Sequence, residues 1–380
     1  MNIKLTLIAA AFILCTSCVS KPKSIQIRDV VGARADSIVR FEVVSWSDSA
    51  VLRKSMPGTL DNGFGVEGGT VLLLNDTFHL FTTEMYDTLS QRYSWKTRFG
   101  HWTSRDGNHW QRVSTIYRGD DDFTGVSIRS ATWSPMPVWD EEANVWNLFY
   151  VTYRSKPNTA DAWYLNYDGR VWRAVSQIKG RKGIGGPYQD VGVVLRSDST
   201  SGTWEGLQGT DSFFPYKAGN RWYAFFGSAQ TQFIPCKFWG VGLATASTLA
   251  GPWNRVNELN PTDLGSTFAE NPVVTVLANK LYIAMIDGGP HETFGYTVSV
   301  DGVHWTKASF IQLPARMPHW WSYMRTPLCL IPKADGTYTT FFTAQTSGGW
   351  ASMGRVTFKL TTRIATPHFY DFTHKKGLDP

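Results

Sequence analysis

The stretch 268–287 reads FAENPVVTVLANKLYIAMID and contains two short apolar segments separated by a polar turn. Valine, isoleucine and tyrosine favour β-strands, and asparagine at the centre is a typical turn residue. The stretch therefore predicts a β-hairpin. A single acidic residue, Glu270, lies at the beginning of its first strand and is followed by Asn271 and Pro272. An apolar hairpin has no structural need for a carboxyl group at that place.

The same unit occurs five times along the chain, at 66–84, 132–151, 210–228, 269–287 and 324–344, and each turn contains Asn, Asp or Gly. Four units are followed by a serine and, six or seven residues later, by a tryptophan: Ser104 and Trp110, Ser197 and Trp204, Ser247 and Trp253, Ser299 and Trp305. We interpret this as a third strand that ends at the serine and a fourth that opens with a tryptophan packed between neighbouring sheets. Five four-stranded units predict an all-β fold, a five-bladed β-propeller.

The two ends of the chain complete this prediction. We expect residues 19 to about 50, with VRFEVVSW at 39–46, to add an early strand or two, and the tail at 363–372, RIATPHFYDF, to close the ring. In residues 1–18, Lys4 precedes an apolar segment and small residues precede Cys18, which resembles the lipobox of a bacterial lipoprotein. The apolar segment is too short to span a bilayer. We therefore expect a lipoprotein-type signal peptide at 1–18 and one propeller domain at 19–380.

These features predict an exported protein, a periplasmic or outer-membrane-anchored lipoprotein of a Gram-negative bacterium, which contacts the membrane only through its lipid anchor. The formal charge of +6 is spread without a Lys/Arg run, which argues against a nucleic-acid partner. The 17 tryptophans are more than a core needs and suit sugar binding. The histidines have no metal-ligand spacing and the glycine-rich 180–190 lacks a phosphate-binding signature, so we expect no metal and no cofactor.

The first strand of each propeller blade lines the central channel, so equivalent positions of the five first strands should face one another. These positions are 55 to 78 residues apart: Glu67, Trp133, Asp211, Glu270 and Arg325. Three acids and an arginine are costly to gather in a channel, and a function explains that cost best. Cleavage of a glycosidic bond needs one protonated and one ionised carboxyl group, and a third acid can raise the pKa of the proton donor.

The loops that join second to third strands should return to the same mouth. They carry six polar residues that we expect at the rim of a pocket: Glu84, Arg154, Gln230, Asp287, His291 and Gln345. Of these, we predict that Gln230, Asp287 and His291 bind substrate together with Arg325 and Trp133.

The elements at 210–228 and 269–285 resemble the third and fourth blade starts of five-bladed propeller glycoside hydrolases, nearest the family 43 arabinofuranosidases, arabinanases and β-xylosidases. The resemblance implies that Glu270 is the general acid and Asp211 the modulator of its pKa. It places Glu67 in the position of the catalytic base, where the family has aspartate, and Arg325 at a blade-five arginine that reaches the substrate. A divergent relative, such as the propeller β-L-arabinofuranosidases of pectin-degrading gut bacteria, fits equally well.

The sequence thus predicts a monomeric, exo-acting glycoside hydrolase that releases a terminal sugar, with pentofuranose or xylose favoured, from a plant-type polysaccharide or oligosaccharide. The resemblance implies inversion at the anomeric carbon, while the longer Glu67 leaves the stereochemistry open. Two alternatives remain: a non-catalytic glycan-binding lipoprotein that uses the same pocket, and phosphorolysis, which needs a basic phosphate pocket beside Arg325.

Overall fold

The computed structural model describes residues 26–88, 95–155, 166–233, 235–277, 280–289, 293–317 and 320–362, and their regular secondary structure is almost entirely β-strand. Blade 1 contains β2 (Gly65–Leu74), β3 (Thr77–Thr88), β4 (Trp95–Ser104) and β5 (Gln111–Arg118). Blade 2 contains β6 (Ala131–Asp140), β7 (Val145–Arg154), β8 (Tyr167–Ser176) and β9 (Tyr188–Arg196). Blade 3 contains β10 (Asp211–Ala218), β11 (Arg221–Ala229), β12 (Trp239–Ala246) and β13 (Asn254–Arg255).

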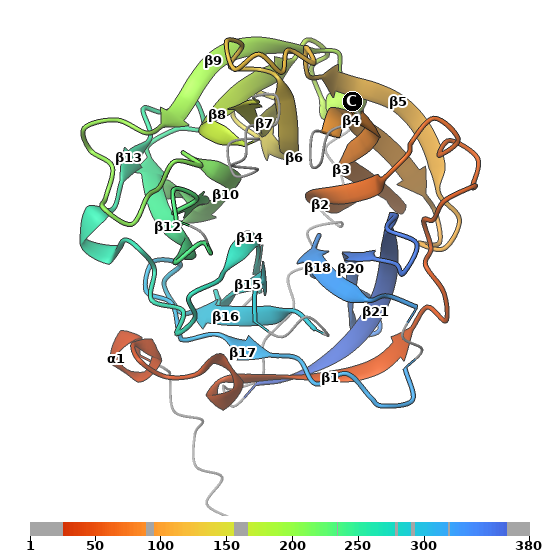
Figure 1. Ribbon diagram of the computed structural model, residues 1–380. Helices are drawn as coiled ribbons and strands as arrows, with labels where there is room; N and C mark the ends of the chain where they lie inside the picture. Colours follow the sequence, from red (N-terminus) through yellow and green to blue (C-terminus); the bar gives the residue numbers. More distant parts are fainter. Residues whose placement is uncertain are drawn as a thin grey trace, which may run out of the picture.

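Blade 4 contains β14 (Glu270–Val276), β15 (Tyr282–Asp287), β16 (Gly295–Ser299) and β17 (Ser309–Phe310). Blade 5 contains β18 (Tyr323–Pro327), β19 (Ile331–Pro332), β20 (Tyr338–Gln345), β21 (Ala351–Thr362) and β1 (Val39–Trp46). The five blades stand in a ring, with β2, β6, β10, β14 and β18 nearest its centre (Figure 1). The predicted five-bladed β-propeller is confirmed.

Strand β1 closes the ring. It runs antiparallel to β21, from the pair Val39 and Thr362 to the pair Trp46 and Val356, and so joins the beginning of the described chain to its end. The ring of Phe41 lies 4.4 Å from that of Tyr296 in blade 4 and 5.2 Å from that of Phe358 in blade 5, centroid to centroid. The early strand predicted at 39–46 is therefore confirmed, whereas the tail at 363–372 and the signal peptide at 1–18 lie outside the described residues.

The serine–tryptophan signature marks the end of the third strand in three blades. In blade 1, Ser104 Oγ accepts the N–H of Gly107 at 2.9 Å, and Ser299 accepts that of Gly302 equally in blade 4. The tryptophans pack between blades, as predicted: the ring of Trp253 of blade 3 lies 6.3 Å from that of Phe149 in blade 2. These turns tie the outer strands to the core.

The signature was misplaced in blade 2. Strand β8 ends at Ser176, and the connection to β9 runs through the 3₁₀ helix Arg181–Gly185, so Ser197 and Trp204 follow the fourth strand and lead into blade 3. The prediction failed because 197–204, SDSTSGTW, has the same serine, glycine and tryptophan order as the three true turns. Trp204 still packs in the core, with its ring 5.6 Å from that of Phe226.

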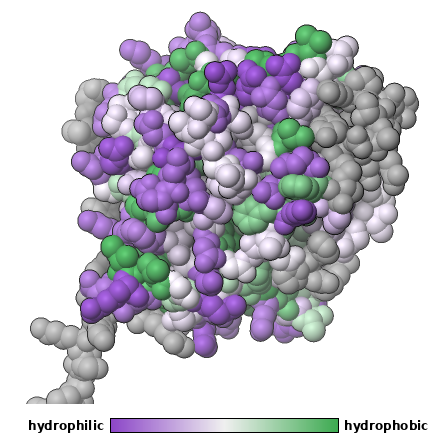
Figure 2. All heavy atoms as spheres, turned by 60° about the vertical axis from the view of Figure 1, so that its left-hand side comes forward, coloured by the Kyte–Doolittle hydropathy of each residue, from purple (hydrophilic) through white to green (hydrophobic). Residues whose placement is uncertain are grey.

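Short helices lie outside the blades, at Ile27–Val30 (α1), Ala35–Ser37 and Asn257–Leu259. No helix in the described part of the chain is long and apolar enough to cross a membrane. Figure 2 shows the side of the molecule that carries blade 3 as a mosaic of hydrophilic and hydrophobic side chains. Scattered apolar residues of this kind are normal for a protein surface.

Candidate active site

The five predicted channel residues lie around one pocket of about 210 Å³ at the centre of the ring. Each comes from a different first strand, in the order β2, β6, β10, β14 and β18. The residues that line the pocket are Glu67, Gly68, Trp95, Trp133, Ser134, Tyr153, Asn166, Gln208, Asp211, Trp239, Glu270, Asn271, Arg325 and Gln345. First-strand starts and second-to-third connections thus share one mouth, as the strand directions predicted.

A β-bulge follows each of these positions. The residue directly after the pocket residue has a positive φ in four blades: 62° at Gly68, 52° at Ser134, 32° at Ser212 and 50° at Asn271. The strand register shifts at the same place in all five blades. Bulges re-aim side chains, and asparagine and glycine adopt this backbone conformation more readily than most residues. This explains why asparagine follows Glu270.

Arg325 connects the acids. Its Nη2 atom lies 2.5 Å from Glu67 Oε1 and 3.1 Å from Glu270 Oε2, and its Nε atom is 3.0 Å from the same oxygen of Glu67. Since both oxygens contact one nitrogen at these distances, they can be at most 5.6 Å apart. Asp287 approaches the guanidinium from β15, with Oδ2 3.4 Å from Nε. Several carboxylates therefore share one cation.

Asp211 is held by three donors. The hydroxyl of Tyr153 donates to its Oδ1, the backbone N–H of Ser212 donates to the same oxygen at 2.7 Å, and the amide of Gln208 donates to Oδ2 at 3.2 Å. Burial raises the pKa of Asp211, while the hydrogen bonds from Tyr153 and Ser212 oppose the rise. The donors fix the direction of both oxygens.

Glu270 is buried, with 6% of its surface exposed. Burial raises its pKa well above the ordinary value; the charge of Arg325 opposes this, and the charges of Asp211, Asp287 and Glu67 add to it. An acid whose pKa is raised keeps its proton at a pH where an exposed glutamate has lost it. The arrangement can therefore supply a protonated carboxyl group beside an ionised one.

Solved structures share this architecture, although no protein-family model and no curated protein sequence matches the chain. A family 117 glycoside hydrolase, Zg3597 of the marine bacterium Zobellia galactanivorans, aligns with a TM-score of 0.58 and 14% identity over 85% of this chain and 91% of that one. A thermostable family-43 glycoside hydrolase aligns with a TM-score of 0.51 and 13% identity over 84% and 99% of the two chains. The GH43_1 enzyme of Xanthomonas citri, complexed with xylotriose, aligns with a TM-score of 0.53 and 11% identity over 87% and 95%.

The chain therefore shares the propeller fold of these glycoside hydrolases. Within this fold the predicted rim residues take different places. Gln345 lines the pocket. Arg154 lies at the end of β7 with its guanidinium bound to Asp168 at 2.6 Å and to the carbonyl of Val126 at 2.6 Å. His291 lies outside the described residues.

Three other rim predictions differ from the structure. Asp287 is buried beside Arg325 and is not among the pocket-lining residues, so its contact with substrate stays a prediction. Glu84 is fully buried in blade 1, where its carboxylate accepts hydrogen bonds from Arg98, Arg112 and Trp102, so its predicted rim position is wrong. Gln230 is not among the pocket-lining residues, and its amide faces the carbonyl of Thr203 at 3.4 Å. Both residues follow second strands, but strand position alone does not say toward which neighbour a side chain turns.

Sequence reasoning missed Trp95, Tyr153, Asn166, Gln208 and Trp239, which line the same pocket. Four of them had a positional signal. Tyr153 directly precedes Arg154 at the end of a second strand, and Gln208 lies three residues before Asp211 in the loop that enters the first strand of blade 3. Trp95 and Trp239 begin third strands, which also start at this mouth.

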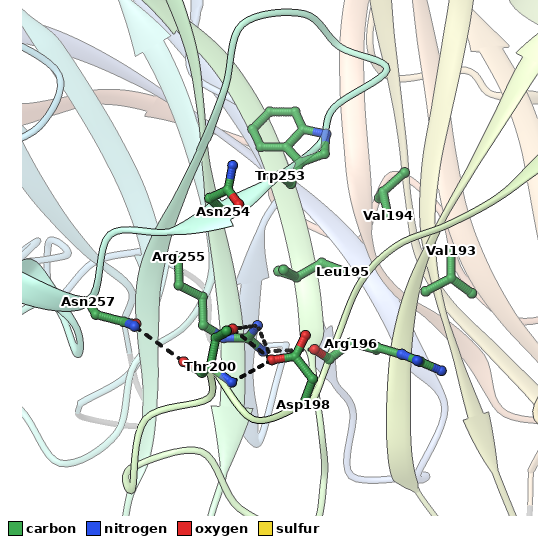
Figure 3. Close-up of a pocket in the computed structure, with 10 residues that line it drawn as sticks. All are labelled: Val193, Val194, Leu195, Arg196, Asp198, Thr200, Trp253, Asn254, Arg255 and Asn257. Carbon is green, nitrogen blue, oxygen red and sulfur yellow. Dashed lines mark hydrogen bonds and ion pairs between the residues drawn. The ribbon is translucent and has the colours of Figure 1, made fainter.

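No cluster of three or more His, Cys, Asp and Glu side chains in the described residues could hold a metal ion. A larger hollow of about 530 Å³ lies between the outer strands of blades 2 and 3 (Figure 3). Its central cation, Arg255, is already paired with Glu205 at 2.7 Å, and Asp198 accepts the hydroxyl of Thr200 at 2.6 Å. The channel pocket, where acids outnumber their cation, is the better candidate for chemistry.

Proposed function

We propose that this protein is a glycoside hydrolase that removes a terminal sugar by general acid and base catalysis. One observation carries the proposal: Glu67 and Glu270 contact the same nitrogen of Arg325 in a pocket that also contains Asp211. Glu270 acts as the acid, because burial and the neighbouring carboxylates raise its pKa. Glu67 acts as the ionised partner, since Arg325 donates two hydrogen bonds to it.

The pocket favours a neutral sugar at a chain end. Its volume of about 210 Å³ is smaller than the roughly 300 Å³ at which pockets for drug-sized ligands begin, which suits a single sugar unit. Arg325 is the only cation among the described residues that line it, and its guanidinium is occupied by acids. A uronic acid would meet uncompensated carboxylates there, whereas the hydroxyl groups of a neutral pentose suit the amides of Asn166, Gln208 and Gln345.

The stereochemical course follows from the carboxyl separation. Inverting glycosidases place their two carboxyl groups roughly 6.5–9.5 Å apart, and retaining ones roughly 5–5.5 Å. The upper limit of 5.6 Å between Glu67 Oε1 and Glu270 Oε2 is nearer to the second range. The family resemblance implies inversion, so the anomer of the first product, observed by NMR, decides between the two courses.

The alternatives have less support. A non-catalytic sugar-binding protein would leave the two glutamates too far apart to share a glycosidic bond, but here they converge on Arg325. Phosphorolysis needs further cations beside Arg325, and the described lining contributes none. The relatives in fold include an enzyme complexed with xylotriose, which supports a plant-type oligosaccharide as substrate.

A screen of aryl pentosides, aryl hexosides and plant oligosaccharides tests the proposal. Glu270→Gln should lower kcat at least a hundredfold while the protein stays folded by circular dichroism, because the amide cannot donate the acidic proton. Glu42→Gln, an exposed change on β1, serves as control and should keep full activity. Full activity in Glu270→Gln would remove this residue from the mechanism.

The export signal, the lipid anchor at Cys18, the location in the envelope and the monomeric state stay predictions, because residues 1–25 lie outside the described part of the chain. Incorporation of labelled palmitate into the protein in cells tests the anchor. Gel filtration of the protein without residues 1–18 tests the monomeric state.

A further inference from the structure

Tyr153 reaches the catalytic carboxylates from a neighbouring blade. It belongs to β7 of blade 2, whereas Asp211, which accepts its hydroxyl proton, opens β10 of blade 3. Only 2% of Tyr153 is exposed, and it packs in the main hydrophobic core. A hydroxyl group in such surroundings is costly unless it is hydrogen-bonded, and it donates to the carboxylate of Asp211.

The surrounding backbone is built to keep this contact. Gly169 lies against the tyrosine ring, since a Cβ atom there would come within 2.7 Å of Tyr153 Cε1. The same glycine binds the loop that enters β10: its N–H donates to the carbonyl of Gln208 at 2.8 Å and its carbonyl accepts from Thr210 at 3.0 Å. Tyr153, Gln208 and Asp211 are therefore held in one rigid unit across two blades.

The donors are unequally divided between the two buried acids. Asp211 accepts from the Tyr153 hydroxyl, the Gln208 amide and the Ser212 N–H, whereas Glu270 accepts from Arg325 at 3.1 Å. Hydrogen bonds to a carboxylate favour its ionised form. When two nearby acids share one proton, the one with more donors releases it to the other.

We propose that Tyr153 is a positioning residue that keeps Asp211 ionised, so that the shared proton stays on Glu270. The inference rests on the proposed function of the pocket. Other titratable or charged groups face this pair as well: Glu67 of β2, Asp287 of β15, and Tyr323 and Arg325 of β18. Burial and the charge of Asp211 raise the pKa of Tyr153 well above its ordinary value, so its hydroxyl remains a donor.

The substitution Tyr153→Phe removes the donor and keeps the ring. Without the hydroxyl group of Tyr153, Asp211 binds a proton more tightly. The acidic limb of the plot of kcat against pH should therefore move up by about one pH unit. We expect kcat at the optimum to fall about tenfold with KM changed less than about twofold, because the loss affects protonation and not sugar contacts. Tyr150→Phe is the matched control: Tyr150 lies on the same strand, is buried, and donates to Asp190 at 2.5 Å.

The proposal is overturned by an acidic limb that stays in place in Tyr153→Phe, or by an equal shift in Tyr150→Phe. A second measurement is independent of turnover. In protein labelled with ¹³C at the aspartate carboxyl groups, the signal absent from Asp211→Asn identifies Asp211, and we expect Tyr153→Phe to raise its midpoint by about one pH unit. An unchanged midpoint contradicts the role of Tyr153, whereas a raised midpoint in a protein that cleaves no glycoside supports it and contradicts only the proposed function.

Discussion

At the scale of single residues, the buried charges of this molecule are of two kinds. At the pocket, Glu67, Glu270 and Asp287 share Arg325 and Asp211 adds a fourth carboxyl group, so the acids outnumber their cation. In blade 1 the charges balance, because Glu84 accepts from both Arg98 and Arg112, and Arg98 also donates to Asp61. An unbalanced acid can exchange a proton with substrate, whereas an acid enclosed by cations cannot, and this separates a functional site from a structural ion pair.

Glu84→Gln should therefore reduce stability and spare catalysis. The neutral amide would leave Arg112 without its carboxylate and Arg98 with Asp61 alone, so we expect a loss of about 3 kcal/mol of unfolding free energy, the lower end for a broken buried ion pair, measured by urea denaturation. We expect kcat of the folded fraction to stay within about twofold of the wild type. Asp87→Asn, on the same strand, removes the exposed pair with Lys96 and should cost less than about 1 kcal/mol. A loss of kcat in Glu84→Gln without a loss of stability would contradict this prediction and indicate that Glu84 takes part in catalysis.

The residues of the site differ in how far sequence predicts them. Glu67, Trp133, Asp211, Glu270 and Arg325 were found because each occupies the same place in a repeated strand. Tyr153 was not found. It lies 58 positions before Asp211 in the chain, and the two residues meet only because blades 2 and 3 pack together. No local pattern carries that information.

At the scale of elements, all five first strands have a β-bulge after the pocket residue, and this bulge sets the direction of the side chain. Gly68 follows Glu67 with φ of 62°, and a Cβ atom there would lie 3.1 Å from Ser134 Oγ in the next blade. Gly68→Ala should lower the unfolding free energy by about 1–2 kcal/mol, because an L-residue is strained at this φ. It should also lower kcat several-fold, since a shifted bulge turns Glu67 away from Arg325.

Gly336→Ala is the control for that prediction. Gly336 has φ of 78° in the hairpin of blade 5 and has open space around its Cβ position. We expect a similar loss of stability by urea denaturation with unchanged kcat. If both variants lose activity equally, or Gly68→Ala loses none, the bulge does not aim Glu67. The hairpins themselves were predictable from turn residues and strand periodicity. The bulges were not, since only Gly68 and Asn271 are residue types that favour the positive φ of a bulge.

At the scale of the whole molecule, a propeller has to join its two ends, and the repeat pattern predicts the ring but not how it closes. Strand β1 lacks the hairpin signature of the other blades, and its partner β21 is more than 300 positions away in sequence. The side chain of Phe41 packs at this closure, because its ring contacts Tyr296 in blade 4 and Phe358 in blade 5.

Phe41→Ala should therefore weaken the closed ring as a whole. Removal of a half-buried phenylalanine from this junction should cost about 2 kcal/mol of unfolding free energy by urea denaturation, less than the roughly 3–5 kcal/mol of a fully buried one. The comparison is Val44→Ala on the same strand, where the register shifts between Val43 and Ser45 and the side chain is 36% exposed; it should cost less than about 0.5 kcal/mol. Equal effects of the two substitutions would mean that β1 covers blade 5 without holding the ring together. A large effect of Phe41→Ala alone ties the stability of blades 4 and 5 to this one strand, because β1 pairs with β21 from Val39 to Trp46, whereas β2 meets β21 only at Gly65 and Ala351 in the described residues.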